Sequence, residues 1–182
     1  MKVQPTSLED VLILEPRLFE DDRGFFFESF NQRAFAQASG REDCRFVQDN
    51  HSLSRCGVLR GLHYQLQQPQ GKLVRVLRGE IFDVAVDLRQ GSASFGRWTA
   101  ARLSADNRRQ MWIPEGFAHG FLTLSEEAEV LYKTTDFYAP EHERSLRWDD
   151  PQLAIDWPLQ GPPLLSAKDA AAPLLGHCER FA

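Results

Sequence analysis

Short segments in which apolar and polar residues alternate run through most of the chain. Within residues 80–88, every second residue from Phe82 to Leu88 is apolar, and Asp83 and Asp87 lie between them. A period of two is typical of a β-strand with one apolar face. The same alternation, or a short apolar run, predicts further strands over residues 11–14, 24–30, 46–51, 58–65, 73–77, 98–103, 110–113, 119–124 and 128–134.

Helical patterns are scarce, and the best of them begins at Asn31. Asn is a favoured N-cap residue, and Gly40 is placed to end the helix. About ten short strands with a few short helices predict an all-β sandwich or barrel, and a jelly roll is the leading option. We expect a single domain over residues 1–182, with the jelly-roll core at roughly 40–140. After Trp148 five prolines mark a C-terminal extension, which we expect to pack on the barrel or on a neighbouring subunit.

The composition is that of a soluble globular protein, with 42% hydrophobic and 26% charged residues among 182. The formal net charge of −5 lacks the basic excess of a nucleic-acid binder. The first apolar run, residues 11–14, is far shorter than a signal peptide or a membrane span requires. The three cysteines (Cys44, Cys56 and Cys178) are odd in number and suit a reducing compartment. We therefore expect a cytoplasmic protein that binds neither nucleic acid nor membrane.

Two segments bring histidines onto strands. One is residues 57–65, which contain His63, and the other is the turn and strand of residues 114–119, which end in His119. This pair of motifs resembles the metal-binding motifs of the cupin superfamily, whose fold is a jelly roll. Here Gln65 stands where the resemblance implies a second histidine, and Lys72 lies near the expected carboxylate. A lysine cation repels a metal ion. The sequence thus argues against a metal, and a metal-dependent cupin is the alternative to exclude.

Without a metal, His63, His119, Lys72 and Tyr132 are the parts of an acid–base site. A histidine can take a proton near neutral pH, and a lysine cation can stabilise an oxyanion that develops on a carbonyl oxygen. On the alternating strand, Tyr132 shares a face with Val130, which we expect to point inward. Together these groups suit removal of a proton next to a ketone, as in a racemisation or an epimerisation.

A longer set of segments, in order along nearly the whole chain, resembles the dTDP-4-dehydrorhamnose 3,5-epimerase family. No single segment is specific, but their combination is. The segments are residues 23–29 (RGFFFES), 46–52 (FVQDNHS), 58–65 (VLRGLHYQ), 70–75 (QGKLVR), 82–87 (FDVAVD), 132–135 (YKTT), 149–151 (DDP) and 165–169 (LSAKD).

The resemblance implies an enzyme without metal or cofactor that inverts C3 and C5 of dTDP-4-dehydro-6-deoxy-D-glucose, giving dTDP-4-dehydro-L-rhamnose for dTDP-L-rhamnose biosynthesis. It also implies a homodimer. By position, His63 resembles the general base, Asp169 its orienting carboxylate, Lys72 the group that stabilises the enolate, and Tyr132 the acid on the opposite face. The substrate contacts that the resemblance implies are Arg23, Glu28, Gln48, Asp49, Asn50, Arg60, Lys72, His119, Tyr138, Glu143 and Lys168.

Several of these residues have plainer interpretations. Asp169 lies three residues after Ser166, the spacing of a helix capping box, and the two roles would compete for the same carboxylate oxygens. Tyr132 could be a core aromatic, and Arg23 could pair with the neighbouring acidic residues of a turn. Arg60 lies three positions before His63, so an ideal strand would put them on opposite faces. Both reach one ligand only if the strand bends, plausibly at Gly61, or if a second subunit shares the site.

Two functional alternatives also stay open at this point. Some relatives in the same fold epimerise a single carbon or isomerise the ketone, and the residues named above do not by themselves decide the product. A sugar-nucleotide-binding module that keeps the barrel without the chemistry is the alternative that is not an enzyme.

Overall fold

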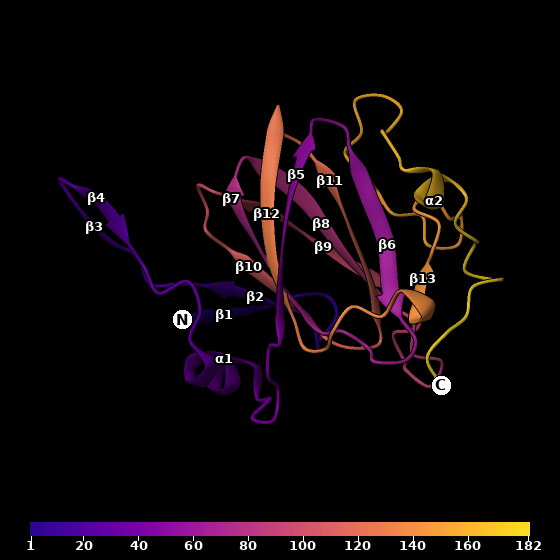
Figure 1. Cartoon of the computed structure of the whole chain (residues 1–182), viewed down its shortest axis with the longest axis horizontal. Helices are drawn as coiled ribbons and strands as arrows, with labels where there is room; N and C mark the ends of the chain where they lie inside the picture. The colour runs from indigo at the N-terminus through magenta and orange to yellow at the C-terminus, as the bar shows by residue number, and fades with distance from the viewer.

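Two antiparallel sheets that face each other make up most of the computed structural model, which describes all residues 1–182 (Figure 1). The first sheet contains, in spatial order, β1 (Lys2–Pro5), β2 (Leu12–Glu15), β10 (Gln110–Ile113), β7 (Lys72–Arg78), β12 (Glu127–Thr134) and β5 (Gln48–Arg55). The second contains β13 (Glu143–Ser145), β6 (Leu59–Gln65), β11 (Phe117–Thr123), β8 (Glu80–Asp87) and β9 (Trp98–Ser104). The predicted all-β jelly roll is confirmed.

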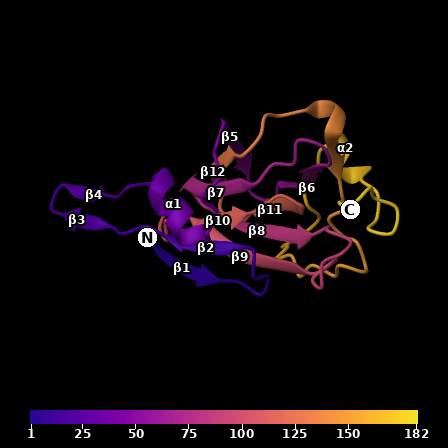
Figure 2. The same ribbon diagram turned by 90° about the horizontal axis from the view of Figure 1, so that it is seen from below.

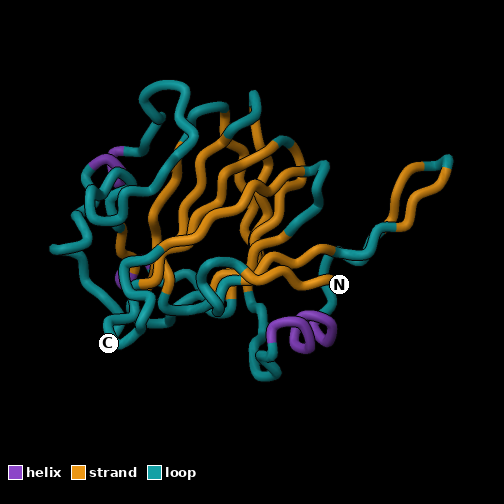
Figure 3. Tube along the Cα trace, turned by 180° about the vertical axis from the view of Figure 1, so that it is seen from behind, coloured by secondary structure: helices purple, strands orange, loops and turns teal.

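The helices are short and lie outside the sheets (Figure 3). Helix α1 (Gln32–Ser39) begins as predicted, because the Asn31 side chain accepts hydrogen bonds from the backbone N–H groups that follow it. It ends at Gly40, whose φ of 69° is left-handed. Helix α2 (Ala167–Ala170) begins after Ser166, the N-cap that the capping-box spacing indicated, whereas the 3₁₀ helix η1 (Pro140–His142) was not predicted. No helix is long and apolar enough to cross a membrane.

The apolar core lies between the sheets and draws on both, through side chains such as Val74, Ile81, Met111, Phe121 and Val130. A second apolar layer covers the outer face of the five-stranded sheet, where Val84 and Val86 pack with Leu153 and Trp157 of the C-terminal extension. The apolar face of β8 is thus turned toward this extension. Asp83, on the other face of β8, is buried between the sheets.

A buried carboxylate joins two parts of the C-terminal extension. Asp150, in the DDP segment, accepts hydrogen bonds from the backbone N–H groups of Gln152 (2.7 Å), Leu153 (3.2 Å) and Leu175 (2.7 Å). The extension packs on its own barrel, where the indole N–H of Trp98 on β9 donates to the carbonyl oxygen of Leu153 (2.9 Å), and α2 lies against β6.

Strand β6 bends at Gly61. This bend is one of the two ways in which Arg60 and His63, three residues apart, could reach the same ligand. In the pairing with β11, His63 lies opposite His119 and Arg60 lies opposite Phe121, so β6 has one more residue than β11 between these pairs. A bulge of this kind reverses the alternation of side chains. Gly61, with φ of 116°, occupies it. Arg60 and His63 consequently line the same cavity.

We expect Gly61→Ala to lower the free energy of unfolding by about 3 kcal/mol, because the left-handed backbone and the close packing both oppose a side chain. A Cβ at this position would lie 2.6 Å from the Cα of Gly120 and 2.7 Å from the carbonyl oxygen of His119. Urea unfolding measures the change. The matched control is Gly91→Ala, where a Cβ meets no atom within 4 Å and stability should change by less than about 1 kcal/mol. Equal losses at both positions would contradict this explanation.

An N-terminal arm, the hairpin of β3 (Phe19–Asp21) and β4 (Gly24–Phe26), projects away from the barrel (Figures 1 and 2). The strand predicted over 24–30 is therefore too long, because pairing ends at Phe26. Phe25 and Phe26 are 57% and 70% exposed. Large apolar side chains on a projecting hairpin are typical of a surface that another chain covers.

Candidate active site

A cavity of about 670 Å³ lies between the sheets, and both contribute its polar side chains. Arg60, His63 and His119 come from the five-stranded sheet, and Lys72 and Tyr132 come from the six-stranded sheet. Ten of the residues predicted from the sequence line this one cavity: Asn50, Arg60, His63, Lys72, His119, Tyr132, Tyr138, Glu143, Lys168 and Asp169.

His63 and Asp169 form a dyad across 106 residues of sequence. The distance between Nε2 of His63 and Oδ1 of Asp169 is 2.5 Å. The prediction that helix capping and His63 would compete for the same oxygens was wrong. Each of the two oxygens of Asp169 has its own partner. Oδ2 accepts from the hydroxyl of Ser166 (2.9 Å), which in turn accepts from the Asp169 N–H (3.1 Å). The N-cap of α2 thus aims the other oxygen at the histidine.

The dyad favours one tautomer of the neutral imidazole. Burial alone would raise the pKa of Asp169, but the hydrogen bond and charge of His63 outweigh it and lower that pKa. Asp169 is therefore a carboxylate at neutral pH, and it favours the tautomer of His63 with the proton on Nε2. That leaves Nδ1 of the half-buried His63 as the atom with a free lone pair.

Lys72 is almost fully buried, with 8% of its surface exposed, and its Nζ donates to the carbonyl oxygen of His63 (3.2 Å). Burial lowers its pKa to about 8, against the opposing charges of Asp83 and Glu143. Below pH 8 the cavity therefore contains an ammonium group with N–H donors available to a ligand. This charge is lost as the pH rises through that value. Such a group is suited to stabilise an oxyanion.

His119 is paired with a residue that the sequence did not single out. Its Nε2 lies 2.7 Å from Oδ1 of Asp83, and both side chains are buried. Burial lowers the pKa of His119, although Asp83 opposes the shift. The imidazole is thus neutral at physiological pH. The sequence offered one sign of Asp83, an acidic residue inside a strand whose other face is fully apolar.

Tyr132 stands on β12, across the cavity from His63 on β6. As predicted, it shares the inward face with Val130 and packs against the core. Burial raises the pKa of its phenol, so the group is protonated at neutral pH. A ligand between the sheets thus has a basic nitrogen on one side and a phenolic proton on the other.

Charged and aromatic groups surround the mouth of the cavity. The Tyr138 hydroxyl donates to Oε2 of Glu143 (2.9 Å), and Lys168 Nζ lies 2.6 Å from the same oxygen. These two bonds outweigh burial and lower the pKa of Glu143. Arg60 donates to Ser54 and to the carbonyl oxygen of Leu53. The mouth offers several cationic donors of the kind that bind phosphate oxygens.

Four predicted substrate contacts do not line the cavity within one chain. Gln48 accepts from the backbone N–H of Tyr138 (3.0 Å), a residue that does line the cavity. Asp49 points to the outer face of the sheet, where it pairs with Lys133 (2.9 Å). Glu28 accepts from Asn31 at the root of the arm.

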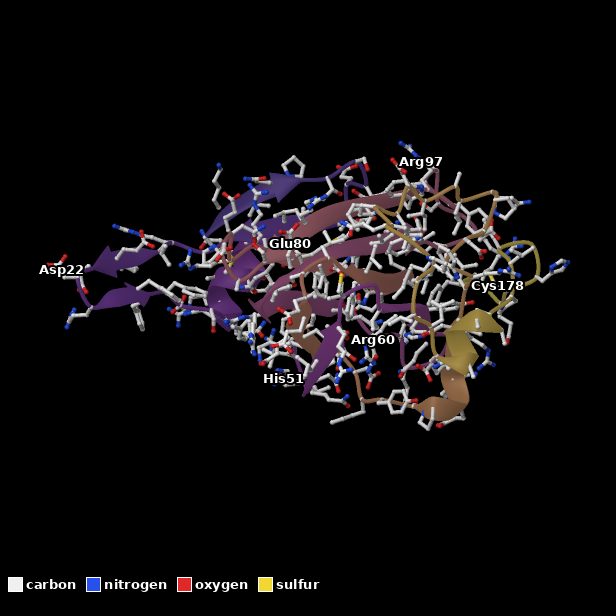
Figure 4. All side chains as sticks on the ribbon, turned by 90° about the horizontal axis from the view of Figure 1, so that it is seen from above. Asp22, His51, Arg60, Glu80, Arg97 and Cys178 are labelled. Carbon is white, nitrogen blue, oxygen red and sulfur yellow. The ribbon has the colours of Figure 1, made fainter.

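Arg23 is the most distant of the four. It lies at the tip of the arm beside Asp22, far from Arg60 in the barrel (Figure 4). Its side chain is 90% exposed and pairs with Asp21. The turn ion pair considered for Arg23 is thus present, and no substrate site lies near Arg23 in its own chain.

The cavity does not offer a set of metal ligands. No group of three or more His, Cys, Asp and Glu side chains is arranged to hold a metal ion anywhere in the chain. Gln65, at the position of the missing cupin histidine, turns its amide to the backbone instead. The arrangement is suited to acid–base chemistry on a bound carbonyl compound.

Comparisons with known proteins give a consistent result. The family model described as dTDP-4-dehydrorhamnose 3,5-epimerase matches residues 5–177. The chain is 68% identical to the enzyme of that name from Pseudomonas aeruginosa, covering 100% of this chain and 99% of the relative, and 60% identical to that from Salmonella typhimurium, covering 96% of each. The crystal structure of dTDP-6-deoxy-D-glucose-3,5-epimerase from Legionella pneumophila in complex with dTDP-4-keto-L-rhamnose is 53% identical, with a TM-score of 0.95 over 100% of this chain and 98% of that one.

Proposed function

The chain belongs to the dTDP-4-dehydrorhamnose 3,5-epimerase family, and on that premise we propose that His63 and Tyr132 are its base and acid. The reaction is epimerisation at C3 and C5 of the 4-keto-6-deoxy sugar of dTDP-4-dehydro-6-deoxy-D-glucose. The observation that supports this division of roles most strongly is the placement of the two groups on facing sheets, with Lys72 buried between them.

In the first half of each epimerisation, Nδ1 of His63 takes the proton from a carbon next to the C4 ketone. The electrons of the broken C–H bond form a carbon–carbon double bond, and the carbonyl electrons move to the oxygen. Lys72 donates a hydrogen bond to that enolate oxygen, which makes the α-proton acidic enough to remove. Asp169 stabilises the imidazolium that results.

In the second half, Tyr132 returns a proton to the same carbon from the opposite face. The enolate collapses to the ketone, and the carbon has the inverted configuration. His63 then holds one proton more and Tyr132 one fewer than at the start, and proton exchange with water restores both. Because C3 and C5 both neighbour the C4 ketone, one pair of groups and one oxyanion site can serve each carbon in turn.

The nucleotide end of the substrate extends to the mouth of the cavity. Arg60 and Lys168 supply positive charge for the diphosphate, and Asn50, Tyr138 and Glu143 complete the rim. His119, neutral and held by Asp83, lies deeper and contacts the sugar. The Legionella relative, seen with dTDP-4-keto-L-rhamnose, supports the assignment of this cavity to a dTDP-sugar.

The functional unit that we propose is a homodimer in the cytoplasm. The exposed Phe25 and Phe26 on the arm need a partner to cover them. A second copy exchanging arms would bring Arg23 and Glu28 to the rim of the partner's cavity. The three cysteines, which form no disulfide, suit a reducing compartment.

The function requires no metal, and turnover in a chelator tests this. Purified protein with dTDP-4-dehydro-6-deoxy-D-glucose and excess EDTA should form the L-sugar at the rate seen without EDTA. Trapping the product with a ketoreductase that accepts only the L-sugar provides the readout. Loss of turnover that returns on adding stoichiometric iron, manganese or zinc would contradict the mechanism.

A further inference from the structure

Gln65 is a buried side chain for which the acid–base mechanism has no use. It ends strand β6 two residues after His63, and only 3% of its surface is exposed. It lines the cavity, yet its amide is turned away from the acid–base groups and toward the backbone. A buried amide of this kind must be hydrogen-bonded, because an unsatisfied polar group costs free energy.

The three hydrogen bonds of Gln65 all go to loops beyond the strand. Its Nε2 donates to the carbonyl oxygens of Gln68 (2.8 Å) and Phe137 (3.2 Å). Its Oε1 accepts from the backbone N–H of Ala139 (3.0 Å). The amide is therefore hydrogen-bonded to the backbone of the residue before Tyr138 and of the residue after it.

The segment around Tyr138 has no sheet pairing of its own, because β12 ends at Thr134 and η1 begins at Pro140. Side chains hold it instead. Besides Gln65, these are Gln48, which accepts from the Tyr138 N–H (3.0 Å), and Glu143, which accepts from its hydroxyl (2.9 Å). Between these fixed points Tyr138 lies at the rim of the cavity, and the residue is 53% exposed.

Tyr138 lies where the nucleotide end of the substrate would leave the cavity. With the sugar between His63, Lys72 and Tyr132, the diphosphate and nucleoside leave through the mouth and pass the rim. An exposed aromatic ring fixed there contacts that end and takes no part in proton transfer at the sugar. We propose that Gln65 is a positioning residue that sets substrate affinity by holding Tyr138 at the rim, an inference that rests on the function proposed above.

The test compares the kinetics of two Gln65 variants. Gln65→Glu keeps the shape but puts a carboxylate oxygen against the carbonyls of Gln68 and Phe137, and Gln65→Met removes all three bonds at similar volume. Each should raise KM, and the Kd of dTDP measured by calorimetry, about tenfold, as expected when an aromatic stacking contact at the rim is lost. The kcat should stay within about twofold, because proton transfer at the sugar is untouched.

A double-mutant cycle identifies the residue through which Gln65 acts. Tyr138→Ala alone should raise KM by at least as much as Gln65→Met. In the Tyr138→Ala background, Gln65→Met should add no further increase, because the ring that it positions is gone. If the two substitutions instead raised KM by independent factors that multiply in the double variant, the proposal would be overturned.

Ser125→Ala is the matched control. Ser125 clamps the turn before β12 with bonds from its hydroxyl to Glu127 and from the Glu80 N–H, at the end of β12 opposite the Tyr138 segment. It should lower the melting temperature without changing KM. If the folded Gln65 variants likewise lose melting temperature but keep KM, or if they lose kcat, the proposal is wrong. A wild-type enzyme that failed to epimerise the substrate would instead contradict the proposed function, whatever the Gln65 variants did.

Discussion

His63→Asn should lower kcat about a thousandfold, the usual contribution of a positioned general base. Asparagine is close to histidine in size but has no basic nitrogen, so no proton can leave C3 or C5. The dTDP affinity should stay close to wild type, because His63 lies at the sugar end of the cavity, whereas the melting temperature should fall slightly, because the shorter asparagine amide does not reach Oδ1 of Asp169. Steady-state kinetics with the ketoreductase trap and calorimetry with dTDP measure the two effects.

The control for this variant is His177→Asn, at an exposed histidine in the C-terminal extension outside the cavity. It should leave kcat, KM and the melting temperature unchanged. Substantial turnover by His63→Asn would show that another group removes the proton, and the assignment of the base would then be wrong.

Tyr132→Phe should separate proton exchange from inversion. The variant keeps the ring that packs against the core but loses the hydroxyl that returns the proton. His63 and Lys72 can still form the enolate, and His63 can then give a solvent proton back to the face from which it took one. In deuterium oxide, we expect the substrate to gain deuterium with its configuration retained, while formation of the L-sugar falls about a hundredfold or more.

NMR of the recovered sugar measures deuterium incorporation and formation of the L-sugar in one sample. Loss of exchange together with loss of inversion would contradict the two-face mechanism, because it would mean that Tyr132 is needed to form the enolate. Normal product formation by Tyr132→Phe would place the acid elsewhere.

Much of the site could be predicted from the sequence because its residues follow local rules. The alternation around Val130 placed Tyr132 on the inward face, and the spacing of Arg60 and His63 pointed to a bend at Gly61, where β6 carries its bulge. The pairing of His63 with Asp169 spans 106 residues, and no period or spacing reports a contact of that range. It came only from the resemblance to a family.

The parts that could not be predicted depend on which partner a polar side chain finds. Asp83 alternates with apolar residues in the manner of a solvent-facing carboxylate, yet both faces of β8 are covered and it pairs with His119. In the sequence, Gln65 could be interpreted only as the residue in place of a metal-binding histidine. Its hydrogen bonds to the loops are evident only in the structure. Arg23 lies on an arm that finds no site in its own chain, which a single sequence cannot reveal.

Solvent exchange by the wild-type protein in deuterium oxide, with dTDP-4-dehydro-6-deoxy-D-glucose as substrate and a chelator present, is the most direct test of enolate formation in this cavity. We expect deuterium at both C3 and C5 of the sugar, with the ketoreductase trapping an L-product labelled at each. Label at one carbon alone would mean that the site serves a single epimerisation, and no label at either would mean that this cavity does not form the enolate.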